Sequence, residues 1–199
     1  MMRRAAAREV GRVDELVAGD PREVLQRIAR GDQDALGELY SRFRVPLFRY
    51  LCQLTGDEAL AEDILQETLV AVWTSAGGFA GQSSVLTWLI GVARRQAHNI
   101  LRRRSVPLAD ADALRDLPAE EPEPEDAVLA RAEREELARA VRRLPTIYRE
   151  ALVLAFVHGL SYREMAEVLE VPEGTVKSRL SNAKRALRAL LDSHEEGIR

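Results

Sequence analysis

The most informative stretch of the sequence is LSYREMAEVLEVPEGTVKSRLSNAKRALR, residues 160–188. Ser161 can cap a helix, and Glu164 three residues later completes a capping box. Pro172 suits the first turn of a second helix, in which apolar residues recur every three or four positions. The remaining surface of that second helix is polar and cationic. An amphipathic helix of this kind, braced by a partner helix, can enter the DNA major groove, so the stretch predicts a DNA-binding helix-turn-helix.

The composition of the 199-residue chain favours helices, because Leu, Ala, Arg and Glu dominate and aromatic residues make up only 5%. The net charge is −3, which excludes a uniformly basic protein that coats nucleic acid. Cys52 is the single cysteine, so no disulfide within the chain and no cysteine-built zinc site is expected. We find neither a signal peptide nor an apolar run of about 18 residues, and we expect a soluble cytoplasmic protein with no membrane span.

Apolar periodicity divides the chain into two helical units. The first unit, residues 21–104, contains helices near 21–30, 32–54, 57–73 and 84–104, with a glycine-rich loop at 75–84. Residues 105–126 hold four prolines and eight acidic residues against the single cation Arg115, which predicts a flexible linker. The second unit covers residues 127–194, with a lead at 1–20 and a tail at 195–199. The sequence therefore predicts an all-α fold of two small helical domains joined by an acidic linker.

Three stretches in this order resemble the extracytoplasmic-function (ECF) sigma factors of bacterial RNA polymerase. DILQETLVAVW (63–73) resembles the region-2 helix that docks on the polymerase clamp. FAGQSSVLTWLIGVARRQAHNILRRR (79–104) resembles the loop and helix that bind the promoter −10 element. LPTIYREALVLAFVHGLSYREMAEVLEVPEGTVKSRL (144–180) resembles region 4, which binds the −35 element.

The resemblance implies two macromolecular partners, core RNA polymerase (through its β′ clamp helices and its β flap) and promoter DNA. It also implies an anti-sigma protein that holds the factor inactive. Neither a cofactor nor a metal is implied, and the polymerase rather than this chain would carry the chemistry. The candidate polymerase contacts are Asp63, Leu65, Gln66, Glu67 and Leu69.

Two further sets of residues are candidate DNA contacts. The −10 set is expected to hold a single strand with one base flipped out, which favours melting without ATP because only the open strand is bound. This set comprises Phe79, Gln82, Ser83, Ser84, Thr87, Trp88, Arg94, Arg95, His98, Arg102 and Arg103. The −35 set comprises Ser161, Tyr162, Thr175, Lys177, Ser178, Arg179, Ser181, Asn182, Lys184 and Arg185.

Within the −35 set, Asn182 can pair bidentately with adenine, whereas Lys177, Arg179 and Lys184 are suited to phosphates, which fix position without reading sequence. Each feature also has a simpler interpretation. The acids of residues 57–67 would suit a solvated helix face, Trp88 a core position, and the cations a solvated helix. The linker is either a plain spacer or a segment that mimics nascent RNA in the polymerase channel.

Two rival functions remain open at this stage. One is a dimeric helix-turn-helix regulator that acts without polymerase and would not require the acidic face of residues 57–73. The other is a helical metalloenzyme built on the acidic clusters, although these lack the Glu-x-x-His pairing of helix-bundle di-metal proteins. Bound metal or a palindromic operator would favour one of these rivals.

Overall fold

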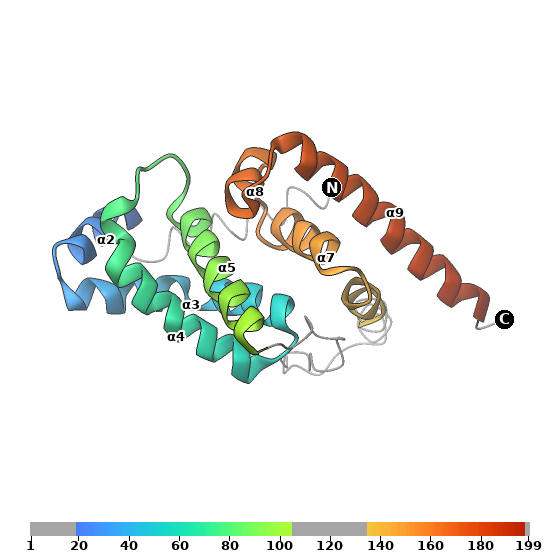
Figure 1. The fold of residues 1–199 in the computed structure, drawn as a ribbon, viewed down its shortest axis with the longest axis horizontal. Helices are drawn as coiled ribbons and strands as arrows, with labels where there is room; N and C mark the ends of the chain where they lie inside the picture. The colour runs from blue at the N-terminus through green and yellow to red at the C-terminus, as the bar shows by residue number, and fades with distance from the viewer. Residues whose placement is uncertain (1–18, 105–134, 198–199) are drawn as a thin grey trace, which may run out of the picture.

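The computed structural model describes residues 19–104 and 135–197, and within these ranges the regular structure is entirely helical. Figure 1 shows two groups of helices side by side, the N-terminal unit in blue to green and the C-terminal unit in orange to red. The predicted all-α fold is thereby confirmed. In chain order the elements are α2 (Pro21–Ala29), α3 (Gln33–Thr55), α4 (Glu58–Ser75), η1 (Ala76–Gly78), α5 (Val85–Arg104), α7 (Thr146–Leu152), η2 (Val153–Val157), α8 (Tyr162–Leu169) and α9 (Glu173–Gly197).

Short polar side chains fix where the helices begin. The carboxylates of Asp20, Asp32 and Asp57 accept backbone N–H groups at the starts of α2, α3 and α4. Such bonds satisfy donors that a helix leaves unpaired at its N-terminus, each typically worth about 1 kcal/mol. At α8, the Ser161 side chain accepts from the Glu164 backbone N–H while the Glu164 side chain accepts from the Ser161 backbone N–H. The predicted capping box is therefore present.

Helix α3 runs for 23 residues as one element, although Pro46 lies inside it. A proline inside a helix removes one backbone hydrogen bond and commonly kinks or ends the helix, but the structure shows a single helix across Pro46. It ends at Gly56, whose φ of +72° closes the helix in the left-handed region. This length lets α3 contact all three other long helices of its unit.

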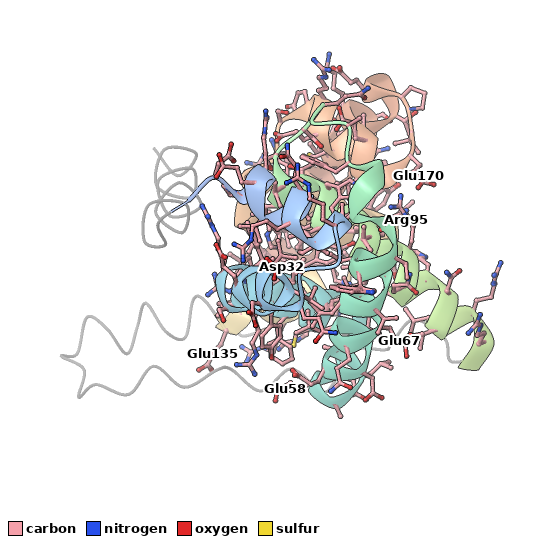
Figure 2. All side chains as sticks on the ribbon, turned by 90° about the vertical axis from the view of Figure 1, so that its left-hand side faces the viewer. Asp32, Glu58, Glu67, Arg95, Glu135 and Glu170 are labelled. Atoms are coloured by element: carbon pink, nitrogen blue, oxygen red, sulfur yellow. The ribbon has the colours of Figure 1, made fainter. Side chains whose placement is uncertain are left out.

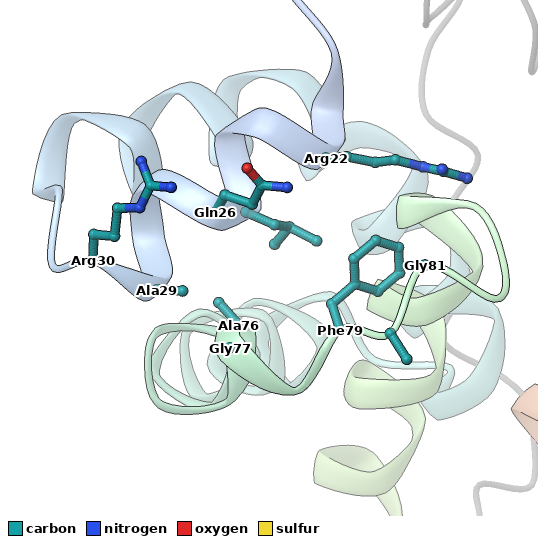
Figure 3. Close-up of a pocket in the computed structure, with 10 residues that line it drawn as sticks. Arg22, Gln26, Ala29, Arg30, Ala76, Gly77, Phe79 and Gly81 are labelled. Atoms are coloured by element: carbon teal, nitrogen blue, oxygen red, sulfur yellow. The ribbon is translucent and has the colours of Figure 1, made fainter.

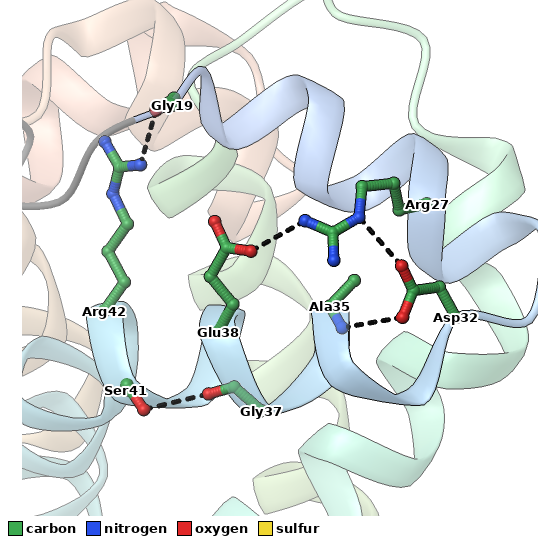
Figure 4. Close-up of polar contacts among 8 residues, drawn as sticks. All are labelled: Gly19, Arg27, Asp32, Ala35, Gly37, Glu38, Ser41 and Arg42. Atoms are coloured by element: carbon green, nitrogen blue, oxygen red, sulfur yellow. Dashed lines mark hydrogen bonds and ion pairs between the residues drawn. The ribbon is translucent and has the colours of Figure 1, made fainter.

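The first unit is a bundle of α2, α3, α4 and α5 around fully buried side chains such as Leu39, Leu51, Ile64 and Leu89. On its surface, Arg27 of α2 donates to Asp32 and Glu38 of α3, both at 2.8 Å (Figure 4). The Arg27 side chain is 43% exposed, so these pairs orient the two helices more than they stabilise them.

The second unit packs α7, α8 and α9 around Leu154, Met165, Val176 and Leu180. Between α7 and α8, η2 is a turn of π-helix, in which the N–H of His158 donates to the carbonyl of Val153 at 3.1 Å. Helix α9 extends to Gly197, past the start of the tail expected at residue 195.

The two units share one continuous apolar core, because α5 packs against α8 and α3 against α7. The acidic linker, the lead at 1–18 and the first residues of the second unit lie outside the described residues. The predictions made for those segments, including the RNA-mimicking linker, stay predictions.

Candidate nucleic-acid and partner interfaces

Helix α4 presents a mixed acidic and apolar face to solvent. Asp63, Gln66 and Glu67 are exposed, and Val70 is 62% exposed one turn further along. The spacing of three and four residues places these four side chains on one side of the helix. Figure 2 shows Glu67 on the outer surface of α4. A large exposed apolar side chain bordered by carboxylates suits a protein partner that carries cations around an apolar pocket.

Leu65 does not belong to that face, because it has no exposed surface and packs in the bundle core. We expected Leu65 as an apolar contact to a partner, but it holds the helix from inside. Leu69 is half-buried at the edge of this exposed face. Val70, which the sequence analysis did not select, supplies the exposed apolar surface. Val70 follows Asp63 by seven residues, which is about two helical turns, so the sequence spacing already places it on the same face as Asp63.

The loop after η1 borders a pocket of about 400 Å³ (Figure 3). Its lining comes from α2, η1 and the loop, with the Phe79 ring on one side and Arg22 and Arg30 toward opposite ends. The ring of Phe79 meets that of Trp88 edge to face, with centroids 5.6 Å apart. An apolar wall with guanidinium groups at the rim suits a nucleobase and its phosphate. No residue of α2 was among the DNA contacts predicted from the sequence.

The loop residues and helix α5 carry the rest of the candidate −10 set. Gln82, Ser84, Arg95, Arg102 and Arg103 are exposed, and Ser83 is half-buried. In contrast, Thr87 is 1% exposed, and the side chain of Arg94 is 17% exposed. Ser84 caps the helix by accepting the Thr87 N–H at 3.0 Å. Thr87 and Arg94 both face the second unit.

Glu150 of α7 is the centre of the polar contact between the units. Its Oε1 accepts from the Tyr50 hydroxyl at 2.8 Å and from Arg94 Nε at 2.9 Å, and His98 Nε2 lies 4.0 Å away. Burial alone would raise the pKa of this carboxyl, but the polar contacts with His98, Arg94 and Tyr50 outweigh it and hold the pKa below its usual range. Glu150 is therefore a buried and charged carboxylate whose Oε1 accepts two hydrogen bonds.

Two more carboxylates of the second unit engage α5. Glu164 accepts from the Thr87 hydroxyl at 3.0 Å, and Glu170 accepts from Arg95 at 3.3 Å. Figure 2 shows Arg95 and Glu170 near each other at the surface. Both of these side chains are more than half exposed, so this pair contributes at most about 1 kcal/mol. Breaking a buried pair such as Arg94–Glu150 costs about 3–5 kcal/mol, so Glu150 dominates the contact.

Helix α9 carries most of the candidate −35 set on an accessible surface. The exposed members are Ser161, Lys177, Ser178, Ser181, Lys184 and Arg185, whereas Tyr162, Thr175, Arg179 and Asn182 are half-buried. Arg185 donates to the Asn182 amide oxygen at 3.0 Å. Lys177 lies over the Tyr162 ring, with its Nζ 5.8 Å from the centroid. The fold thus places an amide suited to base reading among cations suited to phosphates.

The described residues show no group of three or more His, Cys, Asp or Glu side chains that could hold a metal ion. Cys52 is buried, and burial followed by the charges of Glu58, Glu62 and Asp57 raises its pKa to about 11, which makes it a poor nucleophile. No helix among the described residues is long and apolar enough to cross a membrane.

Comparisons with known proteins match both units. Sigma-70 region 2 matches residues 39–106, and sigma-70 region 4 matches residues 134–187. The ECF RNA polymerase sigma-E factor of Escherichia coli K12 is 30% identical over 178 residues, which cover 82% of this chain and 90% of the relative. The chain belongs to the ECF sigma factors of RNA polymerase. The family predicted from the sequence is thereby confirmed.

Other ECF relatives and solved structures agree with this placement. The RNA polymerase sigma-H factor of Pseudomonas aeruginosa is 29% identical over 178 residues, covering 83% of this chain and 90% of the relative. CnrH, solved in complex with the cytosolic domain of CnrY, is 27% identical with a TM-score of 0.63, covering 86% of this chain and 97% of CnrH. RpoE of Bartonella quintana, solved with the anti-sigma factor NepR, is 24% identical with a TM-score of 0.60, covering 78% of this chain and 97% of RpoE. This likeness shows the fold alone.

Proposed function

We propose that this ECF sigma factor binds core RNA polymerase, directs it to promoters with −10 and −35 elements, and promotes opening of the start site. The polymerase carries out the chemistry, and the sigma factor contributes binding alone. Since the polymerase and the chromosome share the bacterial cytoplasm, the factor acts there. The regulator that works without polymerase is not favoured, because the family of this chain acts with the enzyme.

The observation that carries the proposal is the exposed face of α4. Asp63, Gln66, Glu67 and Val70 project from one side of a helix whose other side fills the core. A DNA regulator acting alone has no need for this face. Carboxylates around an exposed apolar side chain fit the cationic clamp helices of the polymerase that the resemblance implies.

The two DNA sites divide the remaining work. The cations of α5 and the pocket beside Phe79 suit a single strand with one extruded base, and binding that strand alone favours melting. The α9 surface suits a duplex major groove. We also propose an anti-sigma partner, because CnrH and RpoE, two chains of this fold, were solved with partner proteins.

The α4 face is tested by Asp63→Ala with Glu67→Ala, assayed by binding to core polymerase and by runoff transcription from genomic fragments. We expect affinity for core to fall about 30-fold, since removing each of the two charges from the interface costs on the order of 1 kcal/mol. Glu23→Ala with Asp34→Ala, which removes two exposed acids from other helices, is the control. Unchanged assembly of the α4 variant would exclude this face as the polymerase contact.

The α9 surface is tested by Asn182→Ala against Lys184→Ala. We expect the Asn182 variant to lose discrimination at one promoter position by about 1–3 kcal/mol. The Lys184 variant should weaken all promoters alike and reduce the salt dependence by about one charge. Transcription from a library of −35 sequences separates the two effects. The assignment of Asn182 fails if both variants keep the same ranking of promoters.

A further inference from the structure

Arg185 is a member of the candidate −35 set for which neither a base contact nor a phosphate contact has been singled out. Its side chain runs back along α9 toward the N-terminus of the helix, and its Nη2 donates to the Asn182 amide oxygen at 3.0 Å. The two residues belong to the same helix and are about one turn apart. The surface of α9 therefore carries a guanidinium and an amide as one hydrogen-bonded pair.

The pair lies on the side of α9 that faces away from the core. Val176, Leu180 and Ala183 are at most 4% exposed and mark the inner side of the helix. At 3.6 residues per turn, Arg185 lies opposite these three residues, with Asn182 next to it. Arg185 is exposed and Asn182 is half-buried. Figure 1 shows α9 along the outer side of its unit, so the pair is open to a DNA duplex.

The bond to Asn182 brings the charge of Arg185 toward the part of the helix that reads bases. Base contacts of a recognition helix come mainly from its N-terminal residues. The Cα of Arg185 lies about 4.5 Å further from that end than the Cα of Asn182. Since long side chains on a helix lean toward its N-terminus, the guanidinium can bond to the amide one turn back. Arg185 thus presents its N–H groups beside the Asn182 amide.

The hydrogen bond also decides which groups the pair offers to a base. Bidentate pairing of Asn with adenine needs the amide oxygen to accept from adenine N6 and the amide nitrogen to donate to N7. In the structure that oxygen already accepts from Arg185. The guanidinium keeps its other N–H donors, so the pair offers mainly donors. Guanine has acceptors at both O6 and N7, and it is the base edge that complements such a pair.

We propose that Arg185 reads a guanine in the −35 element and that Asn182 is its positioning residue, which orients the guanidinium through the amide oxygen. This rests on the proposed function, which assigns α9 to the −35 duplex. It replaces the pairing of Asn182 with adenine that the sequence suggested. Holding the guanidinium in place before DNA arrives reduces the side-chain entropy that is lost on binding.

The assignment of Arg185 is tested with the full chain and core polymerase on a promoter recovered by runoff transcription, with its −35 positions randomised. Each −35 sequence is linked to a barcode in the transcribed region, so counting transcripts ranks the four bases at every position. We expect the wild type to favour guanine at one position by about 5-fold or more, as for one bidentate contact. Arg185→Ala should abolish that preference. A wild type without a guanine preference, or an alanine variant that keeps it, would overturn the proposal.

Arg188→Ala is the matched control, because it removes the same charge from an exposed position of α9 outside the pair. Loss of a cation weakens binding to all templates alike, so transcription should fall without a change in the ranking of bases. Circular dichroism checks that both variants are folded. If the Arg188 variant loses the guanine preference as fully as the Arg185 variant, charge alone is responsible, and Arg185 is not the base reader.

Asn182→Asp tests the positioning role. A carboxylate still accepts from Arg185, and does so more strongly because the pair is charged, but it cannot donate to a base. We expect the guanine preference to be kept, although total transcription falls because a negative charge is added next to the phosphates. Loss of the guanine preference in this variant would show that Asn182 contacts the base itself, and would overturn its positioning role.

Transcription by the wild type separates failure of this proposal from failure of the proposed function. If the wild type starts transcripts with a ranked −35 element and the Arg185 variant keeps that ranking, the function stands and the role of Arg185 is wrong. If the wild type starts no transcript with core polymerase from any template, the proposed function fails, and the role of Arg185 fails with it.

Discussion

At the residue scale, His158 is a titratable group placed where it cannot easily take up a proton. It is 3% exposed, and its ring meets that of Tyr50 edge to face with centroids 5.8 Å apart, between the two units. Burial, and then the charge of Arg49, lowers its pKa from 6.5 to about 4. Because the folded state binds the proton less readily than the unfolded state, protonation favours unfolding or separation of the units.

The stability of the chain should therefore fall as the pH drops from 6.5 toward 4. Above pH 6.5 His158 is neutral in both the folded and the unfolded state, so its lowered pKa does not change the free energy of unfolding. As the pH approaches 4, the loss of this free energy approaches about 3 kcal/mol. Urea denaturation across this pH range measures it. Glu150, whose pKa is lowered, keeps its full contribution above about pH 4.5, the usual value for the carboxyl, and loses it progressively as the pH falls further.

His158→Phe is the matched variant, since it keeps an aromatic ring against Tyr50 and cannot titrate. Between pH 6.5 and 4 the free energy of unfolding of this variant should fall less than that of the wild type. The difference between the two declines is the contribution of His158. Parallel pH profiles for the two proteins would show that His158 is protonated freely in the folded state.

At the element scale, the turn between α8 and α9 depends on one strained residue. Glu170 closes α8 with a φ of +55°, and it is the only non-glycine residue with positive φ in ranges 19–104 and 135–197. A side chain in this left-handed region costs about 1–2 kcal/mol, which glycine avoids. The turn sets the angle between the two helices of the helix-turn-helix, so the strain lies next to the DNA surface.

Glu170→Gly should accordingly be more stable than Glu170→Ala by about 1 kcal/mol. Both variants lose the exposed ion pair with Arg95, so the difference between their free energies of unfolding isolates the cost of the left-handed backbone conformation. The free energy of unfolding from urea titration measures it. An alanine variant as stable as the glycine variant would indicate that the turn relaxes out of the left-handed conformation.

At the same scale, the π-helical turn η2 changes which side chains face the core. The apolar spacing of residues 147–156 in the sequence predicts that Ile147 and Phe156 face inward. Phe156 is instead 39% exposed and lies under Lys184, with Nζ 5.4 Å from the ring centroid. A π turn holds one more residue than an α turn, which rotates its side chains around the axis. Ile147 lies before this turn, on α7, and is 50% exposed.

At the scale of the whole molecule, the two units share a continuous core although the sequence reads as two domains. Tyr50 and Leu154 belong to the same apolar cluster as Leu89 and Met165, which spans both units. The buried pair of Arg94 and Glu150 adds a polar tie at the same contact. Such a chain should unfold as one cooperative unit.

Met165→Ala tests this coupling. Met165 is fully buried in α8, and its truncation should cost about 2–5 kcal/mol. Both tryptophans, Trp73 and Trp88, lie in the first unit. If the units unfold together, the transition followed by tryptophan fluorescence shifts as much as the one followed by circular dichroism. Ile147→Ala, at a position 50% exposed, is the control and should shift neither by more than about 0.5 kcal/mol.

The main helices, the fold class and the family could all be predicted from the amino-acid sequence. Local caps fix the helix starts: the side chains of Asp32, Asp57 and Ser161 each accept from a backbone N–H three residues further along the chain. Such local bonds, together with apolar spacing of three and four, are written in consecutive residues. For this reason the helix starts and the helix-turn-helix could be predicted.

Which surfaces are exposed depends on how the helices pack. Leu65 and Val70 are both apolar residues of α4, yet one has no exposed surface and the other is 62% exposed, because the neighbouring helices cover one side of α4. Thr87 bonds to Glu164, 77 residues away. Contacts between residues so far apart depend on the packing of all the helices at once. No local pattern encodes that packing, so the closed contact between the units emerged only in the folded chain.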